Sequence, residues 1–244
     1  FLRETMHQIM NEIILDPENP LQTKKFSTEE GKIEFDLPKY QDIYMFSSAK
    51  ALTNLENALN KARLSLSLLE SDTLNAIAKD DLEKSDLIKL WIENSIIRVQ
   101  SVYDRVLIFV NKVLDLGIDN EGISHQSITT NDHVERFGLV SLIKAVNKSC
   151  AEYKYIRNKV IHHDRYTEEA LDNLTLILDA NHLSLATGKD ELIAKGQLNL
   201  MVEAYLNTKQ SELTDYLDGI EDKIHDLYEK IIPIYHYKKE VLAK

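Results

Sequence analysis

The sequence has few of the residues that build β-rich, disulfide-stabilised or membrane-embedded proteins. Its 244 residues include one cysteine, Cys150, seven glycines and four prolines. A single cysteine excludes a disulfide framework within the chain and favours a reducing compartment. We expect Cys150 to be a small buried core residue. No apolar run approaches the about 20 residues that a membrane helix needs, and no secretory signal is evident. We therefore expect a cytoplasmic protein with no membrane partner.

Acidic residues outnumber basic ones, 40 to 29, and the only notable concentration of basic residues falls in one short window. The formal net charge of −11 argues against broad, nonspecific binding to nucleic acid, which needs a basic face, and we expect no DNA specificity. Between residues 144 and 165, however, six Lys or Arg stand against two acidic residues. This window therefore carries +4, and the rest of the chain carries −15. A site for an anionic ligand or a solvated helix face beside a loop would give this pattern.

Most of the chain is patterned for helices. Apolar residues three and four positions apart predict one helix from residue 41 to about 69 and another from about 81 to 116. The second helix has a capping-box spacing at Asp80 and Glu83, and its apolar stripe contains one polar residue, Ser95. An all-β fold needs many tight turns, and the sequence has few of the glycines and prolines that form them.

The C-terminal part carries the longest regular pattern. Seven apolar residues alternate at spacings of four and three, as in three heptads of a coiled coil: Leu213, Leu217, Ile220, Ile224, Leu227, Ile231 and Ile234. We favour packing within the chain's own bundle over a coiled coil between chains. Pro233 lies inside the run, so we expect the helix to kink or end there.

The remaining segments are shorter. Residues 2–15 predict a helix, and the alternation within 26–37 predicts a hairpin or extended arm. Residues 117–131 predict a polar loop, followed by a helix at 134–148. We therefore predict an all-α protein, an up-and-down helical bundle with extra helices. The N-terminal helix and extended appendage would occupy residues 1–40 and the bundle 41–244, within one domain overall.

One short segment differs from the rest. From Tyr153 to Asp164 the chain holds two tyrosines, two lysines, an arginine, an asparagine and two adjacent histidines. Arg157 is followed after four residues by His162 and after five by His163. No Cys, Asp or Glu stands at metal-ligand spacing from these histidines, so we expect neither a metal nor another cofactor.

Arg-Asn-x-x-x-His late in a helical chain resembles the Arg-x4-6-His signature of the HEPN superfamily. Those proteins are helical bundles, and many are metal-independent endoribonucleases of toxin and antiviral systems. The resemblance implies that His162 is the acid/base, Arg157 binds phosphate and Asn158 positions the reactants. It makes His163, Tyr155 and Lys159 accessory residues. It also implies a polar contributor from the preceding long helix, for which the candidates are Asn94, Arg98 and Asp104.

The residue types fit RNA cleavage without metal. Histidine transfers protons near neutral pH, and the planar guanidinium of arginine binds two phosphate oxygens at once. A ring such as that of Tyr155 can stack on an unpaired base. Residues five apart on a helix differ by about 140°, so Arg157 and His162 share a substrate only if the helix end is distorted or two copies meet. The resemblance implies the second arrangement, a site formed across a homodimer.

The sequence departs from one pattern of the family. In some members a tyrosine two residues after the histidine is nucleotidylated by a partner enzyme that acts as antitoxin. Here Asp164 follows His162 at that spacing, and Arg165 follows His163, whereas Tyr166 is out of register. The sequence therefore does not support that form of regulation.

Two other functions remain open. One is a non-catalytic HEPN-like module that binds a nucleotide or a protein. The other is a structural scaffold that dimerises through the heptad helix. In the binding module the basic segment would hold the nucleotide or protein. In the scaffold Arg157 would pair with a carboxylate such as Asp164, and the histidines would cap a helix end. The predicted partners are RNA, a second copy of the chain, and an antitoxin or other partner protein.

Overall fold

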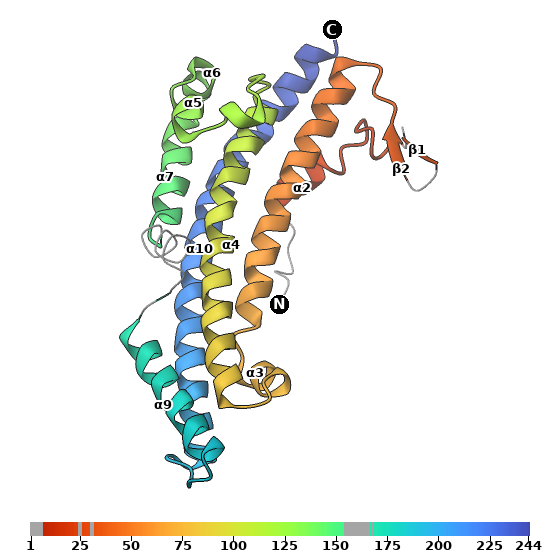
Figure 1. Cartoon of the computed structure of the whole chain (residues 1–244). Helices are drawn as coiled ribbons and strands as arrows, with labels where there is room; N and C mark the ends of the chain where they lie inside the picture. Colours follow the sequence, from red (N-terminus) through yellow and green to blue (C-terminus); the bar gives the residue numbers. More distant parts are fainter. Residues whose placement is uncertain (1–6, 24–25, 30–31, 154–165, 167) are drawn as a thin grey trace. The chain divides into compact units, whose positions relative to one another are not determined.

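Three long helices dominate the computed structural model of the chain (Figure 1). It describes residues 7–23, 26–29, 32–153, 166 and 168–244. The long helices are α2 (Tyr40–Ser67), α4 (Asp81–Val113) and α10 (Lys195–Leu242). The shorter α-helices are α1 (Gln8–Ile13), α3 (Ser71–Ile77), α5 (His125–Thr129), α6 (Asp132–Arg136), α7 (Val140–Cys150) and α9 (Glu169–Ala186).

The β-structure of the described residues is a single antiparallel hairpin. Strand β1 (Phe26–Glu29) pairs with β2 (Lys32–Phe35), with Phe26 opposite Phe35. The predicted all-α class, with a small N-terminal hairpin, is confirmed.

The chain forms two compact units, and each long helix contributes to both. The first unit comprises residues 1–58, 101–149 and 220–244, and the second comprises residues 59–100 and 150–219. The first contains α1, the hairpin, α5, α6 and all of α7 except its last residue, whereas the second contains α3 and α9. The division of the chain at residue 40 stays a prediction.

Aromatic residues fill the core of the first unit. Tyr44, Phe109, Tyr228 and Tyr235 are all at most 2% exposed. The Tyr44 hydroxyl donates to the carbonyl oxygen of Val113 at 2.9 Å, which joins the start of α2 to the end of α4. A buried tyrosine needs such a partner because an unpaired hydroxyl is costly in an apolar interior.

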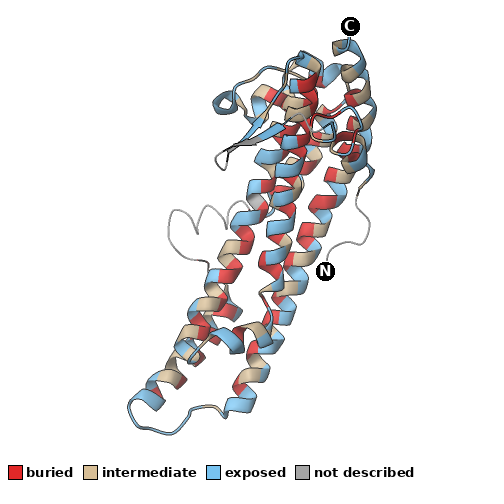
Figure 2. Cartoon of the chain, turned by 90° about the vertical axis from the view of Figure 1, so that its right-hand side faces the viewer, coloured by how far each residue is buried: buried red, intermediate tan, exposed pale blue. Residues whose placement is uncertain are grey.

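The periodic patterns correspond to buried helix faces. All seven heptad residues of α10 are at most 5% exposed, so they pack within the chain as predicted. The stripe of α4 is buried too, and its one polar member, Ser95, donates from its hydroxyl to the Trp91 carbonyl oxygen at 2.8 Å. Figure 2 shows buried residues recurring along each long helix, separated by exposed ones.

Several details differ from the predictions. Helix α10 does not end at Pro233 but continues to Leu242, and the alternative expectation of a kink there stays a prediction. The expected loop at 117–131 contains α5, and α3 follows α2 where no helix was predicted. The expected helix at 134–148 is divided into α6 and α7 by Gly138, whose φ of +71° lies in the left-handed region that glycine adopts readily.

The start of α4 is capped differently from the prediction. The Asp80 carboxylate accepts from the Glu83 backbone N–H at 2.9 Å, as a capping box requires. The Glu83 carboxylate, however, accepts from the N–H of Lys79 at 2.7 Å, one residue earlier than the reciprocal bond of that motif.

Candidate functional site

The segment that carries the predicted catalytic residues lies outside the described part of the chain. We call residues 154–165 the motif segment; its predicted site residues are Tyr155, Arg157, Asn158, Lys159, His162 and His163. Their roles therefore stay predictions. The residues on either side, Tyr153 and Tyr166, are described. The structure thus defines what surrounds the two ends of the motif segment.

Tyr153 is fixed at the N-terminal end. Its ring is 7% exposed and packs against Tyr216 of α10, with ring centroids 4.7 Å apart. Its hydroxyl donates to the Glu212 carboxylate. The Tyr216 hydroxyl donates to the carbonyl oxygen of Cys150 at 2.9 Å, so the last residue of α7 is held by α10 as well. Cys150 is 2% exposed, which confirms the predicted core role.

Tyr166 is held at the C-terminal end by both its main chain and its side chain. Its backbone N–H donates to Oε1 of Glu93 on α4 at 2.8 Å. Its hydroxyl donates to Oε2 of Glu168 at 2.8 Å. The Tyr205 hydroxyl of α10 donates to the same oxygen at 3.0 Å. The residue that follows the motif segment is therefore bound directly to α4 and is linked to α10 through Glu168.

Lys209 of α10 links the residues that hold Tyr153 and Tyr166, the two tyrosines that flank the motif segment. Its ammonium nitrogen lies 2.9 Å from Oε2 of Glu168 and 2.6 Å from Oε2 of Glu212, and its side chain is 4% exposed. These contacts connect the partner of Tyr166 with the partner of Tyr153. We call the connected residues the tyrosine–lysine cluster: Tyr153, Tyr166, Glu168, Tyr205, Lys209 and Glu212.

The protonation states suit this arrangement. Burial opposes ionisation of Glu168, but hydrogen bonds from Lys209 and Tyr166 outweigh it and lower the pKa of the carboxyl. Burial likewise opposes the charge on Lys209, and the two carboxylates outweigh it and raise the pKa of the ammonium. Burial and the neighbouring carboxylates raise the pKa of Tyr153, Tyr166 and Tyr205. Near neutral pH the tyrosines are therefore donors and the lysine is charged.

Sequence reasoning missed the cluster, although one signal for it is present. Tyr205, Lys209, Glu212 and Tyr216 follow each other at spacings of four, three and four, which places them on one face of α10. This polar stripe precedes and overlaps the start of the apolar heptads. Its partners, Glu168 and Tyr153, are separated from it by at least 37 residues, and nothing local indicates which residues they are.

The candidates on the long helix α4 lie in different surroundings. The side-chain amide of Asn94 donates to the Ser65 hydroxyl at 2.9 Å and accepts from Nε of Arg98 at 3.3 Å. Asp104 is exposed and belongs to the first unit. Glu93 of α4 does contact a flank of the motif segment, and it was not among the predicted site residues.

The described residues can also be compared with the requirements of a metal site and of a membrane-spanning helix. The described residues contain no group of three or more His, Cys, Asp or Glu arranged to hold a metal ion. Among the helices of the described part, none combines the length and apolar character that crossing a membrane requires.

Comparison with protein families gives a match over residues 44–232 to the Cthe2314-like HEPN family. The chain belongs to this HEPN family. No match was found among curated proteins or among solved structures. The matched region begins inside α2 and ends inside α10, so it contains the motif segment and the whole tyrosine–lysine cluster. Helix α1 and the hairpin lie outside it.

HEPN membership, which the Arg157-Asn158 and His162 spacing predicted, is therefore confirmed. The match covers most of the helical bundle, whereas the sequence resemblance was confined to one short segment. Membership establishes the fold family. Which reaction the site supports has to be argued from its residues.

Proposed function

We propose that this HEPN protein is a metal-independent endoribonuclease whose active site contains Arg157, Asn158 and His162. The observation that supports this is the position of the arginine–histidine motif within the family match. In keeping with many HEPN proteins, its role would be that of a toxin or a defence factor against phage or stress.

The proposed reaction is an intramolecular transfer at phosphorus. A histidine takes the proton of the 2′-OH, the 2′-oxygen attacks phosphorus, and the bond from phosphorus to the 5′-oxygen breaks. The leaving 5′-oxygen receives a proton from an acid, which regenerates a hydroxyl. Arg157 binds the two non-bridging oxygens, which gain charge as the new bond forms. The products are a 2′,3′-cyclic phosphate and a 5′-hydroxyl.

His162 is the proposed acid/base, and two histidines are needed if one removes a proton while another supplies one. A dimer with the motifs at its two-fold axis would provide both, and His163 could substitute for His162 within one copy. Asn158 would orient the substrate. Tyr155 and Lys159 would contact a base and a phosphate, respectively.

The test is RNA cleavage in EDTA by the wild type, Arg157→Ala and His162→Ala. Arg136→Ala and His133→Ala are matched controls, because both residues are exposed and lie outside the motif segment. We expect EDTA-resistant cleavage by the wild type and both controls. Loss of about 100-fold or more is expected in the two motif variants, as for removal of a group that stabilises transition-state charge or transfers a proton. Equal activity in all five folded proteins would refute the assignment.

A second function is supported by the charge distribution. Outside residues 144–165 the chain carries −15, which disfavours a long RNA and suits a small anion or a basic partner protein. A non-catalytic HEPN module would show ligand-dependent thermal stabilisation with no turnover. That stabilisation, lost in Arg157→Ala, together with no cleavage across a range of RNAs, would favour this second function.

A further inference from the structure

Side chains join the two tyrosines that flank the motif segment, by a route separate from the main chain. The route passes through Tyr153, Glu212, Lys209, Glu168 and Tyr166. The main chain between these tyrosines runs through twelve residues. Four consecutive polar contacts therefore link Tyr153 to Tyr166.

The centre of this route is a lysine with almost no access to water. Lys209 is 4% exposed, and lysine is seldom buried unless it is paired. A buried ion pair adds little stability compared with apolar residues of the same size. Removing the buried ammonium would, however, leave Glu168 and Glu212, whose side chains are 31% and 44% exposed, without the cation that holds them together. We therefore expect loss of Lys209 to displace Glu168 and Glu212 while it lowers the free energy of unfolding only modestly.

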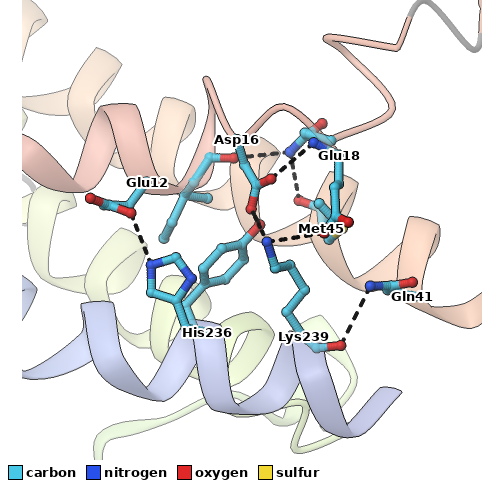
Figure 3. Close-up of polar contacts among 10 residues, drawn as sticks. Glu12, Asp16, Glu18, Gln41, Met45, His236 and Lys239 are labelled. Atoms are coloured by element: carbon cyan, nitrogen blue, oxygen red, sulfur yellow. Dashed lines mark hydrogen bonds and ion pairs between the residues drawn. The ribbon is translucent and has the colours of Figure 1, made fainter. Parts of the chain in front are cut away.

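A second lysine on α10 has similar surroundings and serves as a reference. The ammonium of Lys239 lies 2.7 Å from Asp16 and 3.2 Å from Glu18 (Figure 3). The Tyr235 hydroxyl donates to Asp16 at 3.3 Å. Burial opposes the charge on Lys239 and the two carboxylates outweigh it, so its pKa is raised, as for Lys209. This cluster ties the chain after α1 to α10 in the first unit.

We infer that Lys209 is a positioning residue: through Glu168 and Glu212 it fixes the separation of Tyr153 and Tyr166, and with it the span that the motif segment bridges. Fixing the ends of a short segment reduces the number of conformations open to it, which preorganises any site it carries. The catalytic consequence rests on the proposed function. The structural consequence, protection of the motif segment, does not.

The test uses Lys209→Met, Lys209→Arg and Lys239→Met in the full chain. Methionine is unbranched, as lysine is, and removes the charge, whereas arginine keeps the charge. Trypsin cleaves after lysine and arginine, and the motif segment contains four such sites, at Lys154, Arg157, Lys159 and Arg165. Native-state digestion followed by mass spectrometry measures the rate of cleavage at these sites. Thermal melting reports the global stability of each variant.

We expect Lys209→Met to accelerate cleavage at these four sites by about tenfold, because proteolysis follows the population of locally opened chain. Lys239→Met, at a comparable loss of melting temperature, should leave the rate at these sites within about twofold of the wild type. Lys209→Arg should lie closer to the wild type than Lys209→Met. Equal cleavage rates in Lys209→Met and Lys239→Met would overturn the inference.

The catalytic readout is separate. If the wild type cleaves RNA, Lys209→Met should lower kcat by about tenfold or more with little change in KM, as expected when a site is misplaced rather than stripped of binding groups. Lys239→Met should retain kcat. A Lys209→Met variant with unchanged kcat would also overturn the inference. If the wild type cleaves no RNA, the proposed function fails, and the digestion rates alone decide the role of Lys209.

Discussion

Oε2 of Glu168 accepts hydrogen bonds from the hydroxyls of both Tyr166 and Tyr205, at 2.8 and 3.0 Å. Tyr166 follows the motif segment, and Tyr205 lies on α10, so one carboxylate oxygen joins the end of the motif segment to the longest helix. Lys209 lies against the same oxygen. Tyr166, the residue that follows the motif segment, is thus held by an acceptor that it shares with two other donors.

This sharing predicts a non-additive pair of substitutions. Tyr166→Phe and Tyr205→Phe should each lower the free energy of unfolding by about 1 kcal/mol, because the carboxylate keeps two of its three donors. The double variant should cost more than the sum by about 0.5 kcal/mol or more. Urea unfolding of the four proteins measures the coupling. Strict additivity would show that the two hydroxyls do not share an acceptor in solution.

The N-terminal helix should respond to mild acid through His7. Its Nδ1 accepts from the Ile9 backbone N–H at 3.2 Å and caps α1, while its ring stacks on His225 with centroids 4.9 Å apart. Burial and the nearby His225 lower the pKa of His7, against the opposite effect of Glu229. A histidine whose pKa is lowered in the folded state contributes stability that is present above about pH 6.5. This stability is lost as the pH falls through the pKa of the folded state.

We therefore expect the melting temperature to fall between pH 7 and pH 5, and to fall less in His7→Asn. Asparagine keeps an N-cap acceptor but does not titrate. Melting curves of both proteins across this range provide the measurement, with His133→Ala as the control for an exposed histidine. An identical pH dependence of His7→Asn and the wild type would exclude His7 as the source.

Glu56 should show the opposite dependence on pH. Burial raises the pKa of its carboxyl, Glu221 adds to this effect, and the Tyr228 hydroxyl donates to it at 2.7 Å. A carboxyl whose pKa is raised in the folded state contributes stability that is fully present below about pH 4.5. This stability is lost as the pH rises through the pKa of the folded state. Glu56→Gln retains an acceptor for Tyr228 without the charge. It should raise the melting temperature at pH 8 by about 2–4 °C and have little effect at pH 4.5; a lower melting temperature at pH 8 would contradict this.

A dimeric site predicts that two inactive variants complement each other. If Arg157 of one copy acts with His162 of the other, a mixed dimer of Arg157→Ala and His162→Ala contains one complete site. With free exchange, half of the dimers are mixed and each has one working site of two, so the mixture should recover about one quarter of wild-type activity. Light scattering establishes the dimer, and tagged copies establish the exchange. No recovery despite exchange would exclude a pair of sites that each combine Arg157 of one copy with His162 of the other.

The large features of the fold followed from local periodicity. The buried stripe of α4, with Ser95 inside it, and the heptads of α10 were predicted because apolar residues at helical spacing must face a core. The hairpin was predicted from alternation between Phe26 and Leu37. These signals are strong because each is repeated over several turns or strand residues.

Features set by distant contacts were not predicted. Helix α10 passes through Pro233 although a proline within a helix costs about 3 kcal/mol. Burial of Ile231, Ile234 and Tyr235 around it outweighs that cost, at about 1.5–3 kcal/mol for each large apolar side chain. The tyrosine–lysine cluster was missed because Lys209 meets Glu168 only after the chain has folded. The motif itself was found from sequence, since its residues lie close together along the chain.

The chemistry of the RNA ends tests the central claim most directly. Wild-type protein in EDTA, acting on a labelled single-stranded RNA, should produce fragments with a 2′,3′-cyclic phosphate and a 5′-hydroxyl. His162→Ala, shown to be folded by its melting curve, should produce these fragments at a rate lower by about 100-fold or more. Fragments with a 3′-hydroxyl and a 5′-phosphate, or cleavage that needs a divalent cation, would contradict a nuclease built on Arg157 and His162.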